Sequence, residues 1–233
     1  MMARRPEIGE GLAVVYGRRP VAEARRGRRR VHRFWSAENT EQAELTRLAG
    51  SPDHQGVVAE VDPYPYADPE ALLGAADGLI VALDQVQDPH NLGAVCRSAE
   101  AAGATGVVLP ERRSAGVTAA VCKSSAGAVE HLAVARVTNL ADWLGRAKQA
   151  DAWIYGADAE APTFYTDADL TGKAVLVLGS EGRGLRPRVA EACDIAVSIP
   201  VRGRVASLNV SAAAAALLFE SLRQRGVADG GGG

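Results

Sequence analysis

The chain has 233 residues, of which 47% are hydrophobic and 23% charged, and its formal net charge is −2 at pH 7. This is enough apolar sequence for one large domain or two modest domains with buried cores. No apolar run approaches the roughly 18–20 residues that cross a bilayer, and no apolar stretch follows the charged N-terminus, so the composition predicts neither a membrane protein nor a secretory signal.

The cysteines indicate a reducing compartment. Cys96, Cys122 and Cys193 lie far apart in the sequence, form no CxxC pair and leave an odd count. Such cysteines are typical of buried or free thiols in a cytoplasmic protein, so a disulfide framework is not expected.

The charges are distributed unevenly along the chain. Residues 1–33 contain ten arginines and three glutamates, whereas residues 38–70 are acidic and have Arg47 as their only basic residue. Because the planar guanidinium suits phosphate, the pattern favours RNA contact near the N-terminus, and the alternative is a solvated arginine-rich surface. The candidate RNA contacts are Arg18, Arg19, Arg28, Arg29 and Arg30.

The first part of the chain predicts a small α/β domain over residues 11–61, after a disordered segment at residues 1–10. Its predicted elements are a strand at Leu12–Tyr16, a short helix after Pro20, a strand at Val31–Trp35, a helix capped by Asn39 or Thr40 that runs to about Ala49, and a strand at Val57–Val61. Residues 62–76 contain Asp62-Pro63-Tyr64-Pro65-Tyr66-Ala67-Asp68-Pro69, which is typical of a stiff, turn-rich linker.

After the linker, strands and helices alternate over residues 77–227, before a flexible tail at residues 228–233. The predicted strands are Leu79–Leu83, Gly106–Leu109, Leu132–Val137, Trp153–Tyr155, Ala174–Leu178 and Ile195–Ile199. The predicted helices are Asn91–Ala102, Val117–Ser124, Asn139 to about Ala150, and Leu208–Arg225. This alternation indicates an α/β domain with a mostly parallel sheet covered on both faces.

A first motif, Asp88-Pro89-His90-Asn91-Leu92-Gly93, follows a predicted strand and opens a helix that carries Arg97 about two turns later. Together, Asn91 and Arg97 suit a phosphate or a polarised hydroxyl. The alternative is a capping asparagine and an ordinary surface arginine. No second His or Cys stands at ligand spacing from His90, so no metal site is predicted.

A second motif, Leu178-Gly179-Ser180-Glu181-Gly182, comes at the end of a predicted strand. It has neither the GxxxxGK[ST] nor the GxGxxG spacing, so it is not a nucleotide-phosphate loop. Its glycines let a flat ligand such as adenine approach the main chain, and Glu181 adds a carboxylate. The alternative is a plain tight turn with a solvated glutamate.

A third motif runs from Ile199-Pro200 to Ser207-Leu208-Asn209-Val210-Ser211, at the start of the last predicted helix. Locally, Ser207 alone would be an ordinary N-cap, with Asn209 in the first turn. Ligands of open α/β sheets collect at the carboxyl ends of parallel strands, where all three motifs lie. GxSxG is absent, so covalent acyl chemistry is not expected.

The three motifs together resemble those of the SpoU/TrmH group of the SPOUT superfamily, the RNA ribose 2′-O-methyltransferases. They occur in the family order, and the resemblance covers roughly residues 79–225. It implies a parallel sheet with a deep C-terminal trefoil knot that forms the S-adenosylmethionine pocket, and a homodimer whose interface completes the site. Neither the knot nor the dimer follows from sequence patterning. True knots are so rare that periodicity alone would not suggest one.

A further resemblance concerns the N-terminal part. Tyr16-Gly17 and His54-Gln55-Gly56-Val57-Val58-Ala59 are similar to the small substrate-binding domain, of ribosomal-protein L30e type, in the bacterial subgroup that methylates a guanosine of 23S rRNA. The resemblance implies that activity for this chain, and deleting residues 1–60 is expected to spare cofactor binding and weaken RNA binding. Two alternatives remain: a tRNA ribose 2′-O-methyltransferase with the same motifs, and a non-catalytic RNA-binding or ribosome-assembly protein on the same fold.

The family's motif positions assign the site residues of this chain. Those that match cofactor contacts are Leu178, Gly179, Ile199, Pro200, Ser207 and Leu208. Those that match the polar set around the reaction centre are Asn91, Arg97, Glu181, Ser207 and Asn209. The family's arginine is often described as the base, but an arginine pKa above about 12 makes that demanding. We therefore expect Arg97 to anchor the target phosphate or the developing alkoxide, with Glu181 and Asn209 positioning it.

Overall fold

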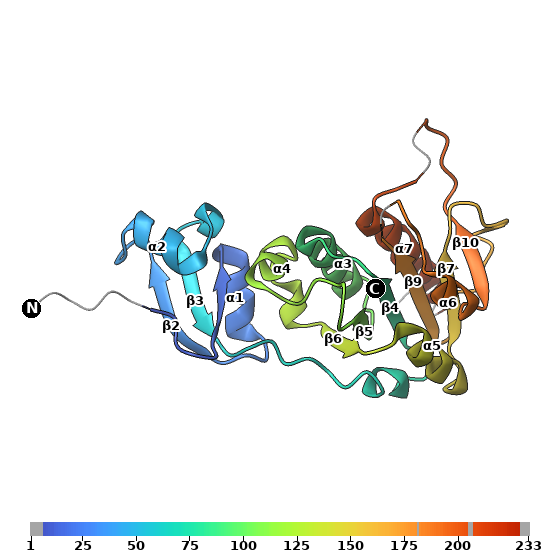
Figure 1. Cartoon of the computed structure of the whole chain (residues 1–233), viewed down its shortest axis with the longest axis horizontal. Helices are drawn as coiled ribbons and strands as arrows, with labels where there is room; N and C mark the ends of the chain where they lie inside the picture. The colour runs from blue at the N-terminus through green and yellow to red at the C-terminus, as the bar shows by residue number, and fades with distance from the viewer. Residues whose placement is uncertain (1–6, 181, 205–206, 229–233) are drawn as a thin grey trace, which may run out of the picture.

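The computed structural model describes residues 7–180, 182–204 and 207–228. The described chain contains two sheets, which lie at opposite ends of an elongated molecule (Figure 1). We call residues 7–61 the N-terminal region and residues 77–228 the C-terminal region. No helix in the described ranges is long and apolar enough to cross a membrane.

The N-terminal region is built on a three-stranded antiparallel sheet of order β1-β3-β2. Its elements are β1 (Ala13–Tyr16), α1 (Arg18–Arg26), β2 (Val31–Ser36), α2 (Gln42–Ala49), the 3-10 helix η1 (Pro52–His54) and β3 (Val57–Val61). The α1 helix begins before Pro20, which sits in its first turn, where a missing N–H costs nothing. Neither Asn39 nor Thr40 caps α2, because that helix starts after Glu41.

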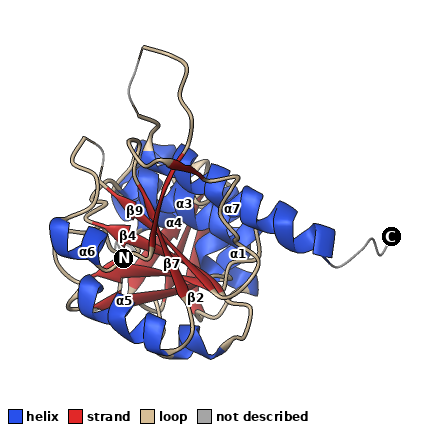
Figure 2. Cartoon of the chain, turned by 90° about the vertical axis from the view of Figure 1, so that its right-hand side faces the viewer, coloured by secondary structure: helices blue, strands red, loops and turns tan. Residues whose placement is uncertain are grey.

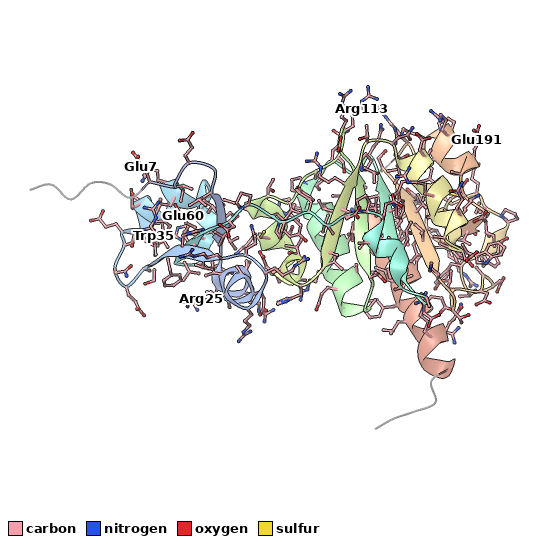
Figure 3. The ribbon with its side chains drawn as sticks, turned by 90° about the horizontal axis from the view of Figure 1, so that it is seen from below. Glu7, Arg25, Trp35, Glu60, Arg113 and Glu191 are labelled. Carbon is pink, nitrogen blue, oxygen red and sulfur yellow. The ribbon has the colours of Figure 1, made fainter. Side chains whose placement is uncertain are left out.

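The segment before β1 is partly held in place. The backbone N–H of Gly9 donates to the Glu60 carboxylate at 2.7 Å, and Arg33 donates to the Glu7 carbonyl at 2.5 Å. Figure 3 shows Glu7, Glu60 and Trp35 together at this end of the molecule. Residues 7–10 therefore contradict the predicted disorder. The rest of that predicted segment, and residues 229–233 of the predicted tail, lie outside the described residues.

The C-terminal region is built on a seven-stranded sheet of order β6-β5-β4-β9-β7-β10-β8, in which every pairing is parallel. Its strands are β4 (Leu79–Asp84), β5 (Gly106–Pro110), β6 (Ala133–Val137), β7 (Trp153–Ala157), β8 (Thr163–Phe164), β9 (Ala174–Gly179) and β10 (Ile195–Ser198). Its helices are α3 (Pro89–Ala101), α4 (Ala119–Ser124), the 3-10 helix η3 (Ala128–Glu130), α5 (Leu140–Gln149), α6 (Pro187–Glu191) and α7 (Val210–Ala228). The predicted parallel α/β sheet is confirmed.

Helices cover both faces of this sheet (Figure 2). One apolar core lies under α3, α4 and α7, and a second lies under α5 and α6. A Cβ at Gly93 of α3 would lie 1.9 Å from the Ser124 hydroxyl oxygen, so the contact between α3 and α4 requires glycine there. Because β9 lies between β4 and β7, with β10 next to β7, the carboxyl ends of these four strands meet at one edge.

The two regions pack against each other rather than being joined only by a linker. The first core includes Val15 and Val21 of the N-terminal region together with Val121 and Val129 of the C-terminal region. In the predicted linker, the hydroxyl of Tyr64 donates to the Leu132 carbonyl at 2.6 Å. The same segment contains the 3-10 helix η2 (Ala71–Gly74), with Leu72 and Leu73 buried. The linker is therefore part of the packed structure.

A candidate active site at the carboxyl edge of the sheet

A cleft of about 500 Å³ lies at the carboxyl edge of the seven-stranded sheet. Its walls come from the loop after β7, the loop after β9, the segment after β10 and the start of α7. Residues far apart in the sequence meet there because their strands are neighbours in the sheet. The cleft is of the size that a small organic ligand needs.

Glycine 179 makes the floor of this cleft possible. A Cβ at Gly179 would lie 2.1 Å from the carbonyl carbon and oxygen of Gly184, so any larger residue would collide with the main chain. The loop folds back because the N–H of Gly184 donates to the Ser180 carbonyl at 3.0 Å. Gly182 and Gly184 both have positive φ, which glycine adopts readily. The main chain at Gly184 therefore packs directly against Gly179 in the wall of the cleft.

Five of the six predicted cofactor contacts line the cleft. They are Leu178, Gly179, Ile199, Ser207 and Leu208. Pro200 is exposed and does not line it, although its neighbours Ile199 and Val201 do. Leu208 is 42% exposed, which is unusual for a leucine near a core and gives the cleft an apolar surface open to solvent.

Two carboxylates at the cleft were not predicted from the sequence. Asp158 and Glu160 follow β7 and line the wall opposite the β9 loop. The turn is fixed because the Asp158 side chain accepts a hydrogen bond from the Glu160 N–H at 3.0 Å. The sequence feature that could have identified them is a pair of acidic residues directly after a buried strand of a parallel sheet. Cys193 also lines the cleft, and burial raises the pKa of its thiol to about 11.

Beside the cleft, the first and third motifs meet. The side-chain amide of Asn209 donates to the Asn91 side-chain oxygen at 3.0 Å. Asn209 also accepts from the Ser211 N–H at 2.8 Å, so it, and not Ser207, supplies the capping oxygen for α7. Similarly, Asp88 and not Asn91 caps α3, by accepting from the His90 N–H. Both asparagines thus lie at the sheet edge, where each takes part in hydrogen bonds within the protein.

The remaining predicted polar residues are only partly brought together. Arg97 is exposed on α3 and makes no hydrogen bond or ion pair with a described residue. Within the described part of the chain, the Asn209 amide donates to Asn91, and the role of Asn209 in positioning Arg97 stays a prediction. Ser207 is exposed at the cleft. Glu181 lies outside the described residues.

Asp84, at the end of β4, fixes the far end of the β9 loop. It is 1% exposed, and its carboxylate accepts from the Arg186 backbone N–H at 2.8 Å and from Arg186 Nε at 2.7 Å. Both oxygens are thus used within the protein. Among the residues with described positions, no group of three or more His, Cys, Asp or Glu side chains is placed to hold a metal ion.

The candidate RNA contacts of the N-terminal region do not all face solvent. Arg29 is buried and pairs with Glu130, so it is corrected from an RNA contact to a structural residue. Arg28 is exposed, yet it donates to the Leu132 carbonyl at 2.7 Å. Three exposed arginines without such a cross-region contact remain, and these are Arg18, Arg19 and Arg30.

Comparison with known proteins gives a consistent result. The model of the SpoU rRNA Methylase family matches residues 78–219. A TrmH family tRNA/rRNA methyltransferase of Bacillus subtilis, YacO, is 39% identical over 91% of this chain and 95% of its own length. The SpoU methyltransferase AviRb from Streptomyces viridochromogenes, crystallised with AdoMet, superposes with a TM-score of 0.80 at 28% identity, covering 92% of this chain and 91% of AviRb. A crystal structure of an RNA 2′-O ribose methyltransferase also has a TM-score of 0.80, at 27% identity over 93% and 90%.

Proposed function

Because this chain belongs to the SpoU rRNA methylase family, as its three motifs predicted, we propose that it transfers a methyl group from S-adenosylmethionine to a ribose 2′-hydroxyl of RNA. One observation carries the proposal: the cleft floored by Gly179 opens beside the hydrogen-bonded pair of Asn91 and Asn209. A small-molecule site and a polar site for a second substrate then share one edge of the sheet, as group transfer requires.

The residues of the cleft fit the cofactor. Leu178, Ile199 and Leu208 offer an apolar slot for adenine, and Gly179, Gly182 and Gly184 line the cleft without side chains. The carboxylates of Asp158 and Glu160 are suitable acceptors for hydroxyl and ammonium donors, which both the ribose and the methionine ends carry. When bound, S-adenosylmethionine supplies an electrophilic methyl on a sulfonium. AviRb, at 28% identity, was crystallised with this cofactor.

The polar residues act on the RNA. Asn91 and Asn209 would border the ribose 2′-hydroxyl, whose oxygen gains the methyl carbon as the bond from that carbon to sulfur breaks, with the hydroxyl proton released to water. The guanidinium of Arg97 offers N–H donors and no acceptor, so it anchors the target phosphate or stabilises the developing alkoxide. Glu181 and Ser207 complete the set, by their match to the family's motif positions.

Binding and transfer assays test this function. We expect titration calorimetry with S-adenosylmethionine to give saturable heat, and labelled methyl groups to pass to ribosomal RNA at ribose oxygens. A non-catalytic RNA-binding or assembly protein would bind RNA without heat from the cofactor and without transfer. That result would reject the proposal.

The preferred substrate is a guanosine of 23S rRNA. It is supported by the N-terminal region, where Arg18, Arg19 and Arg30 are exposed beside the sheet, and by the His54-Gln55-Gly56 stretch. Mapping 2′-O-methyl sites in RNA from cells with and without the gene tests the assignment. A missing site in 23S rRNA supports it, whereas a missing site in tRNA favours the second candidate, a tRNA ribose methyltransferase.

The same proposal includes a homodimer, a knotted backbone and an L30e-like N-terminal region. For the dimer, Phe219 and Leu222 of α7 are 48% and 40% exposed, and light scattering should give twice the chain mass. For the knot, the support is that α7, which follows β10 in the chain, packs against α3, which follows β4 at the centre of the sheet. For the N-terminal region, the support is the motif match and its mixed α/β elements.

A further inference from the structure

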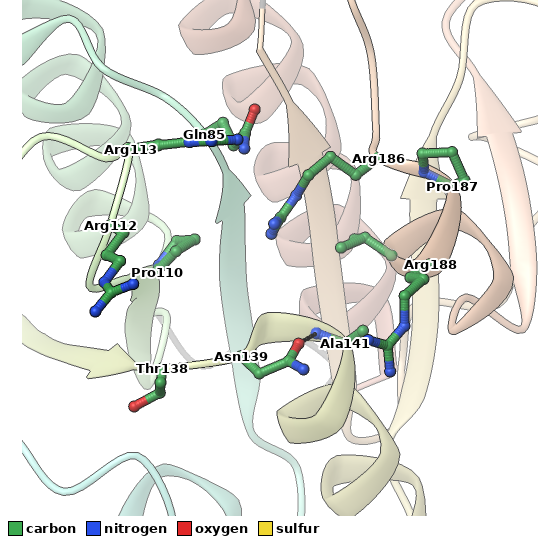
Figure 4. A pocket seen from close by; sticks show the side chains of 11 residues that line it. Gln85, Pro110, Arg112, Arg113, Thr138, Asn139, Ala141, Arg186, Pro187 and Arg188 are labelled. Carbon is green, nitrogen blue, oxygen red and sulfur yellow. Dashed lines mark hydrogen bonds between the residues drawn. The ribbon is translucent and has the colours of Figure 1, made fainter.

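We propose that Arg112 and Arg113 form a phosphate-binding subsite that holds the RNA backbone next to the methylated nucleotide. The inference rests on the proposed function, because it takes RNA as the substrate. It concerns a second cleft, of about 680 Å³, which is separate from the one assigned to the cofactor. Figure 4 shows the side chains that line it, with Arg112 and Arg113 from the turn after β5 and Arg186 and Arg188 from the start of α6.

The two arginines stand at the tip of a turn that is anchored at both ends. Before them, the Glu111 N–H donates to the Val137 carbonyl at 2.9 Å. After them, the Ala115 N–H donates to the Val86 carbonyl at 2.9 Å. Arg113 has a φ of +59°, which a residue with a Cβ adopts only when its surroundings enforce it. The turn therefore presents both side chains from a fixed backbone, and Figure 3 shows Arg113 at the rim of the C-terminal region.

The other two arginines of this cleft already have partners. Arg186 pairs with the buried Asp84 at 2.7 Å, and Arg188 lies 3.5 Å from Asp142. Arg112 and Arg113 are exposed, and neither makes a hydrogen bond or ion pair with a residue that the structure describes. Their positive charges are thus available to an anion from solution.

The position of the cleft points to RNA as that anion. One loop lines both clefts, with Gly182 to Leu185 facing the proposed cofactor cleft and Arg186 to Val189 facing the arginine cleft. Gln85 lines the arginine cleft and is six residues before Asn91, a span of at most about 20 Å of chain. A strand whose ribose lies at Asn91 therefore has neighbouring phosphates within reach of Arg112 and Arg113.

The chemistry favours a phosphodiester over a free nucleotide. The cleft offers the guanidinium groups of Arg112 and Arg113, but none of its lining residues is aromatic, so a base has no stacking surface there. Guanidinium groups bind phosphate oxygens with paired hydrogen bonds and without regard to sequence. The subsite therefore adds affinity and register, not base choice.

The test compares binding of a short, single-stranded RNA of mixed sequence by fluorescence anisotropy over a range of salt concentrations. We expect Arg112→Gln/Arg113→Gln to weaken binding about tenfold or more at low salt, and to reduce the slope of log K against log[salt] by about 1. Arg112→Lys/Arg113→Lys should keep most of the affinity, because it keeps the charge. Calorimetry should give the same affinity for S-adenosylmethionine in all variants.

The matched control removes two positive charges from another face. Arg146 and Lys148 lie on α5, where they pair with Glu70 and Asp194. We expect Arg146→Gln/Lys148→Gln to change RNA affinity less than about twofold, because it affects only the overall charge. Equal losses in both double variants, or none in Arg112→Gln/Arg113→Gln, would overturn the subsite. The binding assay needs no turnover, so the two proposals can fail separately. If the protein does not methylate RNA but needs Arg112 and Arg113 to bind it, only the proposed function is rejected.

Discussion

Arg29 of the N-terminal region and Glu130 of the C-terminal region form an ion pair across the junction, with only 3% and 1% of their side chains exposed. Arg29 Nε donates to one carboxylate oxygen at 2.9 Å, and the same guanidinium lies 3.3 Å from the sulfur of Cys122. The pair joins residues 101 positions apart and fixes the two regions relative to each other. The exposed arginines of the N-terminal region, which we propose to contact RNA, are therefore held at a constant position relative to the sheet edge.

Removing one partner of this pair should be strongly destabilising. We expect Arg29→Leu to lower the free energy of unfolding by about 3–5 kcal/mol, because it leaves the Glu130 carboxylate buried without a counter-charge. The double variant Arg29→Leu/Glu130→Leu should recover most of that loss. Urea denaturation measures both. As a control, Arg26→Leu removes an exposed arginine paired with Glu23 and should change stability by no more than about 0.5 kcal/mol.

Deleting residues 1–60 should have a different result from the one that the sequence predicted. The sequence alone predicted a separate domain whose loss spares cofactor binding. In the structure, the deletion removes Val15, Val21 and Arg29 and exposes Val121 and Glu130, which belong to a shared core and a buried ion pair. We expect the truncated protein to melt at lower temperature and to aggregate. A soluble truncation that binds S-adenosylmethionine with unchanged affinity would show that the two regions fold independently.

Gly179→Ala should abolish binding of S-adenosylmethionine while the rest of the fold persists. The new Cβ would have to displace the main chain at Gly184, which forms the floor of the cleft. Calorimetric titration measures the loss. Gly172→Ala is the matched control, because a Cβ there meets no atom within 4 Å and its φ is not in the left-handed region. If Gly179→Ala binds the cofactor as tightly as Gly172→Ala, the cleft has been assigned to the wrong ligand.

The variant Arg97→Lys tests whether Arg97 anchors the RNA through the two-pronged geometry of its guanidinium or only through its positive charge. We expect methyl transfer to fall by about 10²–10³, since a lysine lacks the planar fork that holds a phosphate or alkoxide with two hydrogen bonds. The affinity for S-adenosylmethionine should not change, because Arg97 does not line that cleft. Single-turnover methylation with saturating cofactor gives the rate. Nearly full turnover in Arg97→Lys would reject the anchoring role.

Long, buried strands were predictable because they are uninterrupted apolar runs. The predicted strand at Leu79–Leu83 is β4 and that at Ala174–Leu178 is β9, each one residue longer in the structure. By contrast, β8 and α6 have two and five residues, which is too short for any periodicity to be recognised. The order of strands in the sheet also depends on contacts between distant segments.

Helix starts were less predictable, because the residue types that cap helices also occur one to three positions away from the true cap. Asn91 and Ser207 were reasonable cap candidates, yet Asp88 and Asn209 supply the capping oxygens. Of the two residues that do cap, Asn209 also meets the first motif, because its side-chain amide donates to Asn91. Local preference could not identify the capping residue, since neighbouring Asp, Asn and Ser side chains can all form such local hydrogen bonds.

Burial of a single arginine within a basic run was not predictable. Arg28, Arg29 and Arg30 are consecutive, and only Arg29 turns inward, because its partner Glu130 lies in a distant η3 turn. The acidic wall of the cleft was missed for a related reason. Asp158 and Glu160 stand in a loop without a recognisable motif, and only the placement of β7 beside β9 brings them to the site.

The three thiols should be nearly inert in the folded protein at pH 8. Burial raises the pKa of Cys96 to about 12 and the pKa values of Cys122 and Cys193 to about 11. At pH 8 a pKa of 11 leaves a thiolate fraction of about 10⁻³, against about a quarter for an ordinary thiol. Iodoacetamide labelling followed by mass spectrometry should therefore be about 200-fold slower than in denatured protein, or slower still.

The raised pKa values also fix how stability changes with pH. The folded protein keeps these thiols protonated, whereas the unfolded chain releases their protons above its ordinary pKa of about 8.5. Their contribution to stability is fully present below about pH 8.5 and is lost as the pH rises toward 11. Denaturation midpoints should fall over that interval, and a variant with all three cysteines changed to alanine should show a shallower decline. Rapid labelling of the native protein at pH 8 would contradict the burial of these thiols. An equally steep fall of the denaturation midpoint in the variant without cysteines would show that the thiols do not cause it.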